Sequence, residues 1–217
     1  MRACIFDLDG TLVNTLPTVQ HYCNLSLTHF GLQPVSQDAC RNLCRLPIAS
    51  FYHRLVRLGG CPEEQVDALA PCVRDYDVAA YLTDYRYLTE PYSGIAELLQ
   101  ALQKRGVVTA VLTNKPAKVA ENLMADLFPG AFAIVRGQTP ETISKPDPRS
   151  LWNLLSDLHV RRDQCVYVGD TDVDMDTARA AGALAAAATW GFQERELLLK
   201  CGPDFVADTP EDLLALF

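Results

Sequence analysis

Short, uniformly apolar segments recur along the chain, separated by stretches in which apolar residues follow helical spacing. Uninterrupted apolar runs are typical of strands that are covered on both faces of a sheet. The helical stretches carry an apolar stripe, as in Tyr92–Arg105, where Ile95, Leu98, Leu99 and Leu102 share one face. The predicted strands are Ala3–Phe6, Val107–Leu112, Ala133–Val135, Cys165–Val168, Leu184–Ala188 and Phe205–Val206. Strands that alternate with helices predict an α/β fold with a doubly wound, Rossmann-like parallel sheet.

One long segment interrupts this alternation. Residues 14–88 show only helical periodicity and turns, whereas connections in α/β units usually take roughly 2–6 residues. The predicted helices are Leu16–His29, Gln37–Cys44, Ile48–Leu58 and Pro62–Tyr87. Extra helices along one sheet edge would explain the segment. We favour an inserted α-helical cap, because the insertion begins at the carboxyl end of the first strand, where open α/β sheets bind ligands. The predicted domains are a core of residues 1–13 and 89–217 and a cap of residues 14–88.

Two carboxylates follow the first predicted strand. Asp7 and Asp9 are two residues apart, so in extended backbone they face the same side and can converge. Such close carboxylates repel each other unless a metal ion holds both ionised, or one carries a proton and acts as an acid. Gly10 permits a sharp turn and a close backbone approach to a ligand. Taken alone, this pattern equally fits a turn that merely ends a strand.

Polar side chains also follow three later strands. Thr113 and Asn114 offer a hydroxyl and an amide that can hydrogen-bond phosphate oxygens, and Lys145 can act as a point charge for phosphate. Asp170 and Asp174 gather where a strand gives way to a helix, a donor set that suits a hard cation such as Mg²⁺. Each feature alone has an ordinary explanation, such as a helix cap or a solvated lysine. Together they predict a phosphate and metal site at one sheet edge.

These segments, in this order, resemble the four motifs of the haloacid dehalogenase superfamily. The matching segments are Asp7–Leu12, Thr113–Asn114, Lys145–Pro148 and Gly169–Asp174. The resemblance spans the chain, and two tail segments, Thr189–Gly191 and Gly202–Asp204, are similar to the phosphoglycolate phosphatase-like branch. That branch carries a helical cap at the position of the inserted segment.

The resemblance implies a covalent mechanism. Asp7 would attack phosphorus and become an aspartyl phosphate, and Asp9 would protonate the leaving oxygen and then deprotonate a water. Mg²⁺ would be held by the Asp7 carboxylate, the Asp9 backbone carbonyl and Asp170. Asp174 would orient a metal-bound water or Lys145 from further out.

The resemblance also implies a substrate site and an activity. Thr113, Asn114, Lys145 and the metal would stabilise the phosphoryl oxygens, with Gly10 close by. The implied activity is Mg²⁺-dependent hydrolysis of a small-molecule phosphate monoester, as in phosphoglycolate phosphatase. An acid at Asp9 fits hydrolysis or phosphomutase turnover, so a β-phosphoglucomutase-like enzyme is the enzymatic alternative. A catalytically silent phosphate-binding or regulatory relative is the non-enzyme alternative, but it should have lost at least one of the catalytic or metal-binding side chains.

Two departures from the branch bear on the substrate. Asn14 stands where an aspartate is common, and Cys44–Pro47 occupies the segment of a specificity loop. If the leaving group carries a carboxylate, Arg45 is the best candidate to bind it, because it lies in a break between two predicted helices. Arg41 and Arg54 are weaker candidates. The alternative for each arginine is a solvated surface residue.

Composition and charge limit the binding partners and the cellular compartment that we expect. The formal net charge of −8 argues against a general nucleic-acid or membrane-surface binder. A phosphatase of this charge needs a metal and a few cations to reverse the field locally. The 8 cysteines contain no Cys-x-x-Cys pair, which favours reduced thiols in a cytoplasmic protein. The chain enters a strand at once and has no long apolar run, so we expect no signal peptide or membrane span. The expected partner is a small phosphorylated metabolite, and the expected state is a monomer or weak homodimer.

Overall fold

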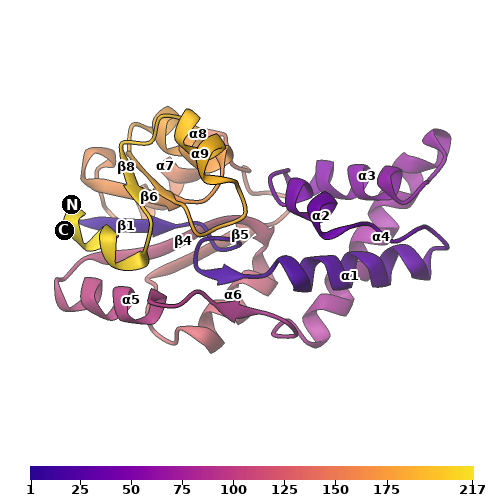
Figure 1. Ribbon diagram of the computed structural model, residues 1–217, viewed down its shortest axis with the longest axis horizontal. Coiled ribbons are helices and arrows are strands. Elements are labelled where there is room, and N and C mark those ends of the chain that lie inside the picture. Colours follow the sequence, from indigo (N-terminus) through magenta and orange to yellow (C-terminus); the bar gives the residue numbers. More distant parts are fainter. The chain divides into compact units, whose positions relative to one another are not determined.

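The computed structural model describes residues 1–217, except for the side chain of Ala49. The chain divides into two compact units (Figure 1). Met1–Asn14 and Pro91–Phe217 form the first, which we call the α/β unit, and Thr15–Glu90 form the second, the helical unit. Within the described residues, no helix is both long enough and apolar enough to cross a bilayer.

A parallel sheet forms the centre of the α/β unit, with strand order β5-β4-β1-β6-β7-β8. The strands are β1 (Ala3–Phe6), β4 (Val108–Pro116), β5 (Ile134–Gln138), β6 (Cys165–Gly169), β7 (Leu184–Ala188) and β8 (Phe205–Ala207). Each corresponds to a predicted strand, and β1 and β7 have the predicted bounds. The predicted Rossmann-like fold class is therefore confirmed.

Helices cover both faces of this sheet (Figure 1). They are α5 (Ile95–Lys104), α6 (Ala117–Leu127), α7 (Pro148–Asp157), α8 (Asp172–Ala181) and α9 (Arg195–Lys200), with 3-10 turns at Arg162–Gln164 and Pro210–Leu216. Asp147 caps α7, accepting a hydrogen bond from the Arg149 backbone N–H at 2.9 Å. The prediction started α5 too early, at Tyr92. Gly94, with a φ of 86°, has left-handed backbone that no regular helix can include, so α5 begins after it.

The register of the central strand determines where the site lies. β1 pairs with β4 on one side and with β6 on the other, and Phe6 lies opposite both Val111 and Val168. The three strands run in the same direction, so their carboxyl ends meet at one edge of the sheet. Residues that follow β1 and β6, and the last residues of β4, therefore come together there.

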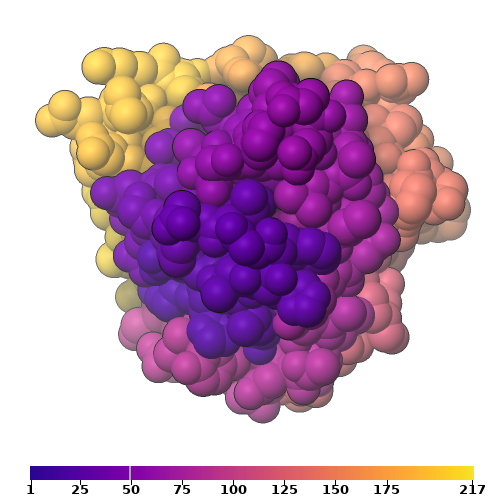
Figure 2. Space-filling model, turned by 90° about the vertical axis from the view of Figure 1, so that its right-hand side faces the viewer, coloured from indigo at the N-terminus to yellow at the C-terminus, as the bar shows by residue number. Residues whose placement is uncertain are grey.

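The helical unit contains α1 (Leu16–His29), α2 (Gln37–Leu43), α3 (Ile48–Leu58) and α4 (Glu63–Thr83). Its space-filled surface faces the viewer in Figure 2, with α1 in indigo. α1 and α3 have the predicted bounds. Two short strands, β2 (Val13–Asn14) and β3 (Glu90–Pro91), pair in a separate small sheet.

α4 is shorter than its sequence pattern predicts. The prediction extended this helix to Tyr87, but it ends at Thr83. Side chains of α1 take the carbonyl groups beyond that point: the Tyr22 hydroxyl donates to the Asp84 carbonyl and the Thr18 hydroxyl to the Tyr87 carbonyl, each at 2.8 Å. These tertiary hydrogen bonds replace the helical ones, which helical periodicity alone does not reveal.

A buried carboxylate links three helices of the helical unit. Asp77 on α4 accepts hydrogen bonds from the Tyr52 hydroxyl of α3 at 2.7 Å and from the Ser26 hydroxyl of α1 at 3.2 Å. Burial, reinforced by the Asp77 charge, raises the pKa of Tyr52 well above its ordinary value, so its hydroxyl stays protonated and donates. A buried charge needs such donors to offset its lost hydration.

We expect Tyr52→Phe to lower the free energy of unfolding by about 1–3 kcal/mol, because it leaves one oxygen of a buried carboxylate without its donor. Urea titration followed by circular dichroism measures the change. Tyr87→Phe is the matched control, since Tyr87 is 43% exposed, and it should change stability by less than about 0.5 kcal/mol. Equal effects of the two variants would contradict a structural role for the Tyr52–Asp77 hydrogen bond.

Candidate active site

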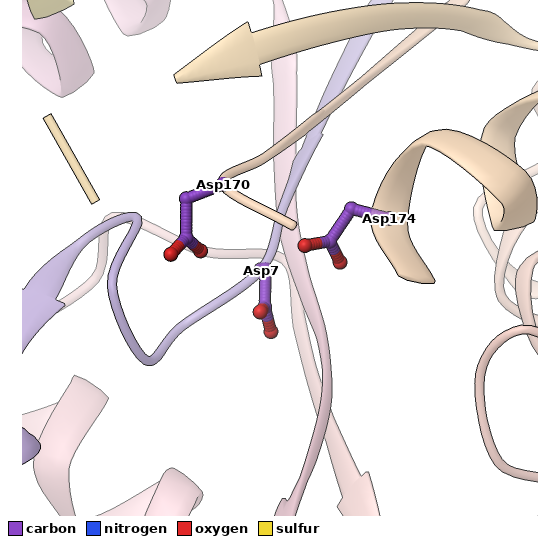
Figure 3. A group of neighbouring side chains, drawn as sticks. All are labelled: Asp7, Asp170 and Asp174. Carbon is purple, nitrogen blue, oxygen red and sulfur yellow. The ribbon is translucent and has the colours of Figure 1, made fainter. Parts of the chain in front are cut away.

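Three buried carboxylates converge at the carboxyl edge of the sheet. Asp7 follows β1, Asp170 follows β6, and Asp174 lies in the first turn of α8. One oxygen from each lies within 4.8 Å of the others, and the three side chains point toward a shared space (Figure 3). The sequence predicted a metal site formed by these three residues and Asp9, and the cluster contains the first three.

The cluster holds more negative charge than a protein interior favours. The pKa of Asp7 is raised to about 7, mainly by burial; Lys145 opposes the shift and the charge of Asp174 adds to it. Burial, with the charges of Asp174 and Asp7, also raises the pKa of Asp170 well above its ordinary value. Like charges gathered in a low-dielectric site require a proton or a cation to compensate them.

Lys145 supplies part of that compensation. Its ammonium lies 2.8 Å from Asp7 Oδ1 and 2.7 Å from Asp174 Oδ1. Burial disfavours its charge, but Asp174 and Asp7 outweigh burial, so the pKa of Lys145 is well above its ordinary value. Tyr167 on β6 completes the surroundings: the ammonium lies 5.7 Å from the centre of its ring, and its hydroxyl is 3.3 Å from Asp174 Oδ1. The sequence prediction did not include Tyr167 in the site, because it lies in an apolar run that is typical of buried core residues.

Asn114 holds the main chain of Lys145. Its Oδ1 accepts a hydrogen bond from the Lys145 backbone N–H at 3.0 Å, and its Nδ2 donates to the Lys145 carbonyl at 3.2 Å. The sequence predicted a phosphate contact for this amide, and that contact stays a prediction. In the structure, both ends of the amide fix the segment that carries Lys145.

The Asp9 carboxylate has a separate cationic partner. Lys115 Nζ lies 3.0 Å from Asp9 Oδ1 and 3.3 Å from Oδ2, and the Lys115 side chain is only 3% exposed. Lys115 was not among the predicted site residues. A usable signal was present, because Lys115 is two residues after Thr113 in extended backbone and so faces the same side. Thr113 is buried, and its hydroxyl accepts a hydrogen bond from the Lys115 backbone N–H at 3.2 Å.

Asp170 is held by groups from two distant parts of the chain. The Thr11 hydroxyl donates to its Oδ1 at 2.9 Å, and the Phe192 backbone N–H donates to its Oδ2 at 2.7 Å. Gly10 makes the predicted turn, with a φ of 82°, and a Cβ there would lie 2.2 Å from Asp170 Oδ2. The prediction missed Thr11 and Phe192, and a backbone donor such as that of Phe192 has no signature in sequence.

The donor set fits a divalent cation. In their ionised forms, four carboxylates and two ammonium groups leave a formal charge of −2, and carboxylate oxygens suit Mg²⁺. Asp7, Asp170 and Asp174 each offer one oxygen to such a cation. Both oxygens of Asp174 are engaged, one by Lys145 and the other by the Thr171 hydroxyl at 2.7 Å. Both oxygens of Asp170 accept hydrogen bonds as well, so the indirect role of Asp174 stays a prediction.

Arg45, the predicted specificity residue, belongs to the helical unit. It lies in the turn between α2 and α3 and is partly exposed, as expected for the break between two predicted helices.

Comparison with known proteins identifies the family. Residues 4–188 match the family described as haloacid dehalogenase-like hydrolase. The chain is 33% identical over 215 residues to a phosphoglycolate phosphatase from Synechococcus elongatus, covering 99% of this chain and 96% of the relative. It is 29% identical over 220 residues to the N-acetylmuramic acid 6-phosphate phosphatase of Pseudomonas aeruginosa, covering 99% of this chain and 93% of the relative.

A solved structure shares the fold. A predicted phosphoglycolate phosphatase from Haemophilus somnus superposes with a TM-score of 0.90 at 24% identity, covering 100% of this chain and 97% of the other. The chain belongs to the haloacid dehalogenase-like hydrolase family, and the predicted family resemblance is confirmed.

The charge of the cluster predicts a stabilising effect of Mg²⁺ that is independent of turnover. A cation that binds only the folded state at 100 times its dissociation constant adds about 2.7 kcal/mol, which raises the midpoint of thermal unfolding. We expect this rise in the wild type and its loss in Asp170→Asn. Asp176→Asn, which alters an exposed carboxylate on α8, the helix that carries Asp174, should keep it. An unchanged Mg²⁺ response in Asp170→Asn would contradict the assigned site.

Proposed function

We propose that this chain is a Mg²⁺-dependent phosphatase that hydrolyses a small phosphorylated metabolite through an aspartyl phosphate on Asp7. That the chain is a phosphatase of this family follows from its relatives. The observation that carries the finer proposal is the position of the Asp7 carboxylate. It lies at the carboxyl edge of the sheet, 2.8 Å from a buried ammonium and beside Asp170 and Asp174. The α/β unit would be the catalytic core and the helical unit its cap.

The first half-reaction transfers the phosphoryl group to the protein. A carboxylate oxygen of Asp7 attacks phosphorus, the bond from phosphorus to the leaving oxygen breaks, and Asp9 gives that oxygen its proton. Lys145 and the Thr113 hydroxyl would bind the phosphoryl oxygens as charge shifts onto them. The products of this step are the free alcohol and phosphorylated Asp7.

The second half-reaction returns the protein to its starting state. Asp9, now a carboxylate, accepts a proton from water, and the water oxygen attacks phosphorus. The bond to Asp7 breaks, its electron pair returns to the Asp7 carboxylate, and phosphate leaves. A Mg²⁺ ion held by Asp7 and Asp170 would lower the negative charge that an anionic substrate meets.

We expect Asp7→Asn to lower turnover of p-nitrophenyl phosphate by several orders of magnitude, because it removes the attacking charge and one metal ligand together. Circular dichroism confirms that the variant is folded. In Asp9→Asn, mass spectrometry of peptides after reaction with an activated phosphoryl donor should place a phosphoryl group on Asp7. A phosphoryl group on another residue, or near-normal turnover by folded Asp7→Asn, would refute the covalent mechanism.

The relatives share one type of reaction but differ in their substrates, so they define the substrate class less precisely than the reaction. The relatives include phosphatases named for phosphoglycolate and for N-acetylmuramic acid 6-phosphate. Both of these compounds contain a phosphate monoester and a carboxylate. We propose a substrate whose leaving group carries a carboxylate, with phosphoglycolate as the first to test. Arg45 is the proposed cation for that carboxylate, because it lies at a break between helices in the proposed cap.

A functional Arg45 contact is a charge-assisted hydrogen bond worth about 1.5–3 kcal/mol. Arg45→Ala should therefore lower kcat/KM for phosphoglycolate roughly tenfold to a hundredfold. It should change p-nitrophenyl phosphate hydrolysis far less, because that leaving group has no carboxylate. Arg54→Ala, an exposed position within α3, is the matched control and should affect neither substrate. Equal losses on both substrates, or no loss on either, would reject Arg45.

A further inference from the structure

Lys115 is a buried cation that has no role in the mechanism proposed above. It is the last but one residue of β4, two residues after Thr113, and its side chain is 3% exposed. Lysine side chains are seldom this buried unless they are paired. Its partner is Asp9, which the proposed mechanism uses twice, first as an acid and then as a base.

The geometry of the contact orients the whole carboxylate. Lys115 Nζ approaches both oxygens of Asp9, at 3.0 Å and 3.3 Å, so it limits rotation of the carboxylate as well as its position. Lys115 is itself anchored: its backbone N–H donates to the Thr113 hydroxyl, and both residues lie on β4, next to β1. A charge-assisted contact from an anchored strand is a strong constraint on a side chain in the loop after β1.

We propose that Lys115 is a positioning residue for Asp9, holding its carboxylate in the orientation that accepts a proton from water in the second half-reaction. The inference rests on the proposed function. In the step, a proton passes from water to Asp9, the water oxygen bonds to phosphorus, and the bond from phosphorus to Asp7 breaks.

The proposal predicts that loss of the Lys115 ammonium affects the two half-reactions differently. With p-nitrophenyl phosphate the leaving group departs readily without a proton, so phosphorylation of Asp7 depends little on Asp9. Hydrolysis of the phosphorylated enzyme still needs the base. If Lys115 positions that base, removing its ammonium slows the second half alone, and phosphorylated Asp7 accumulates. A lysine with a purely structural role would not change how the enzyme divides between its free and phosphorylated forms.

The experiment uses the full chain with Mg²⁺ and p-nitrophenyl phosphate, and compares Lys115→Met with Lys118→Met. Lys118 is an exposed lysine at the start of α6 and serves as the control. In Lys115→Met we expect kcat to fall about tenfold to a hundredfold, part of what a positioned base contributes. Rapid quenching followed by intact mass measurement should show a larger phosphorylated fraction than in the wild type. Lys118→Met should match the wild type in both measurements.

A double variant tests whether Lys115 acts through Asp9. Asp9→Asn with Lys115→Met should be no slower than Asp9→Asn alone, because the positioned group is already missing. Multiplying losses, or a fall in kcat without accumulated phosphoenzyme, would overturn the proposal. If Lys115→Met does not fold, Lys115→Gln, which keeps a donor without the charge, is measured instead under the same criteria. If Asp9→Asn accumulates no phosphorylated enzyme, the proposed covalent mechanism is wrong. If Asp9→Asn accumulates it and Lys115→Met does not, only the inference about Lys115 is wrong.

Discussion

The site depends on one ammonium group held between two buried carboxylates. Lys145 contacts Asp7 after β1 and Asp174 at the start of α8, so a single charge joins segments that are far apart in the sequence. Any of the three charges buried alone would cost several kcal/mol of hydration, and only their mutual contact makes the burial tolerable. The supporting contacts serve this arrangement: Asn114 fixes the main chain of Lys145, and Tyr167 lies beside its ammonium.

The same electrostatic logic explains how an acidic chain can attract an anion. The formal charge of −8 is distributed over the whole molecule, whereas Lys145 and Lys115 are buried at the carboxyl edge of the sheet. Charges in a low-dielectric site act more strongly on a bound group than solvated charges on the surface do. The four carboxylates and two ammonium groups there leave a formal charge of −2, which a bound divalent cation would neutralise, so the overall charge of the chain says little about what the site binds.

Much of the fold could be predicted because parallel strands buried on both faces have uniformly apolar sequences. That pattern gave the bounds of β1 and β7 correctly, and polar residues directly after apolar runs identified the edge where Asp7 and Asp170 meet. The specific side-chain partners could not be predicted in this way. Whether Lys115 reaches Asp9, or Asn114 a backbone group, depends on rotamers and main-chain positions that only the folded structure defines. The early end of α4 has the same origin, since hydroxyl groups of another helix determine it.

The central place of β1 has a consequence for how the protein is made. β1 is synthesised first, but its neighbours in the sheet begin only at Val108 and Cys165. Contacts between segments so distant in sequence must wait until the ribosome has delivered both partners. The nascent chain therefore exposes Asp7 long before Lys145 and Asp170 exist to surround it. The Asp7 carboxylate acquires its buried surroundings only when the later half of the polypeptide closes around β1.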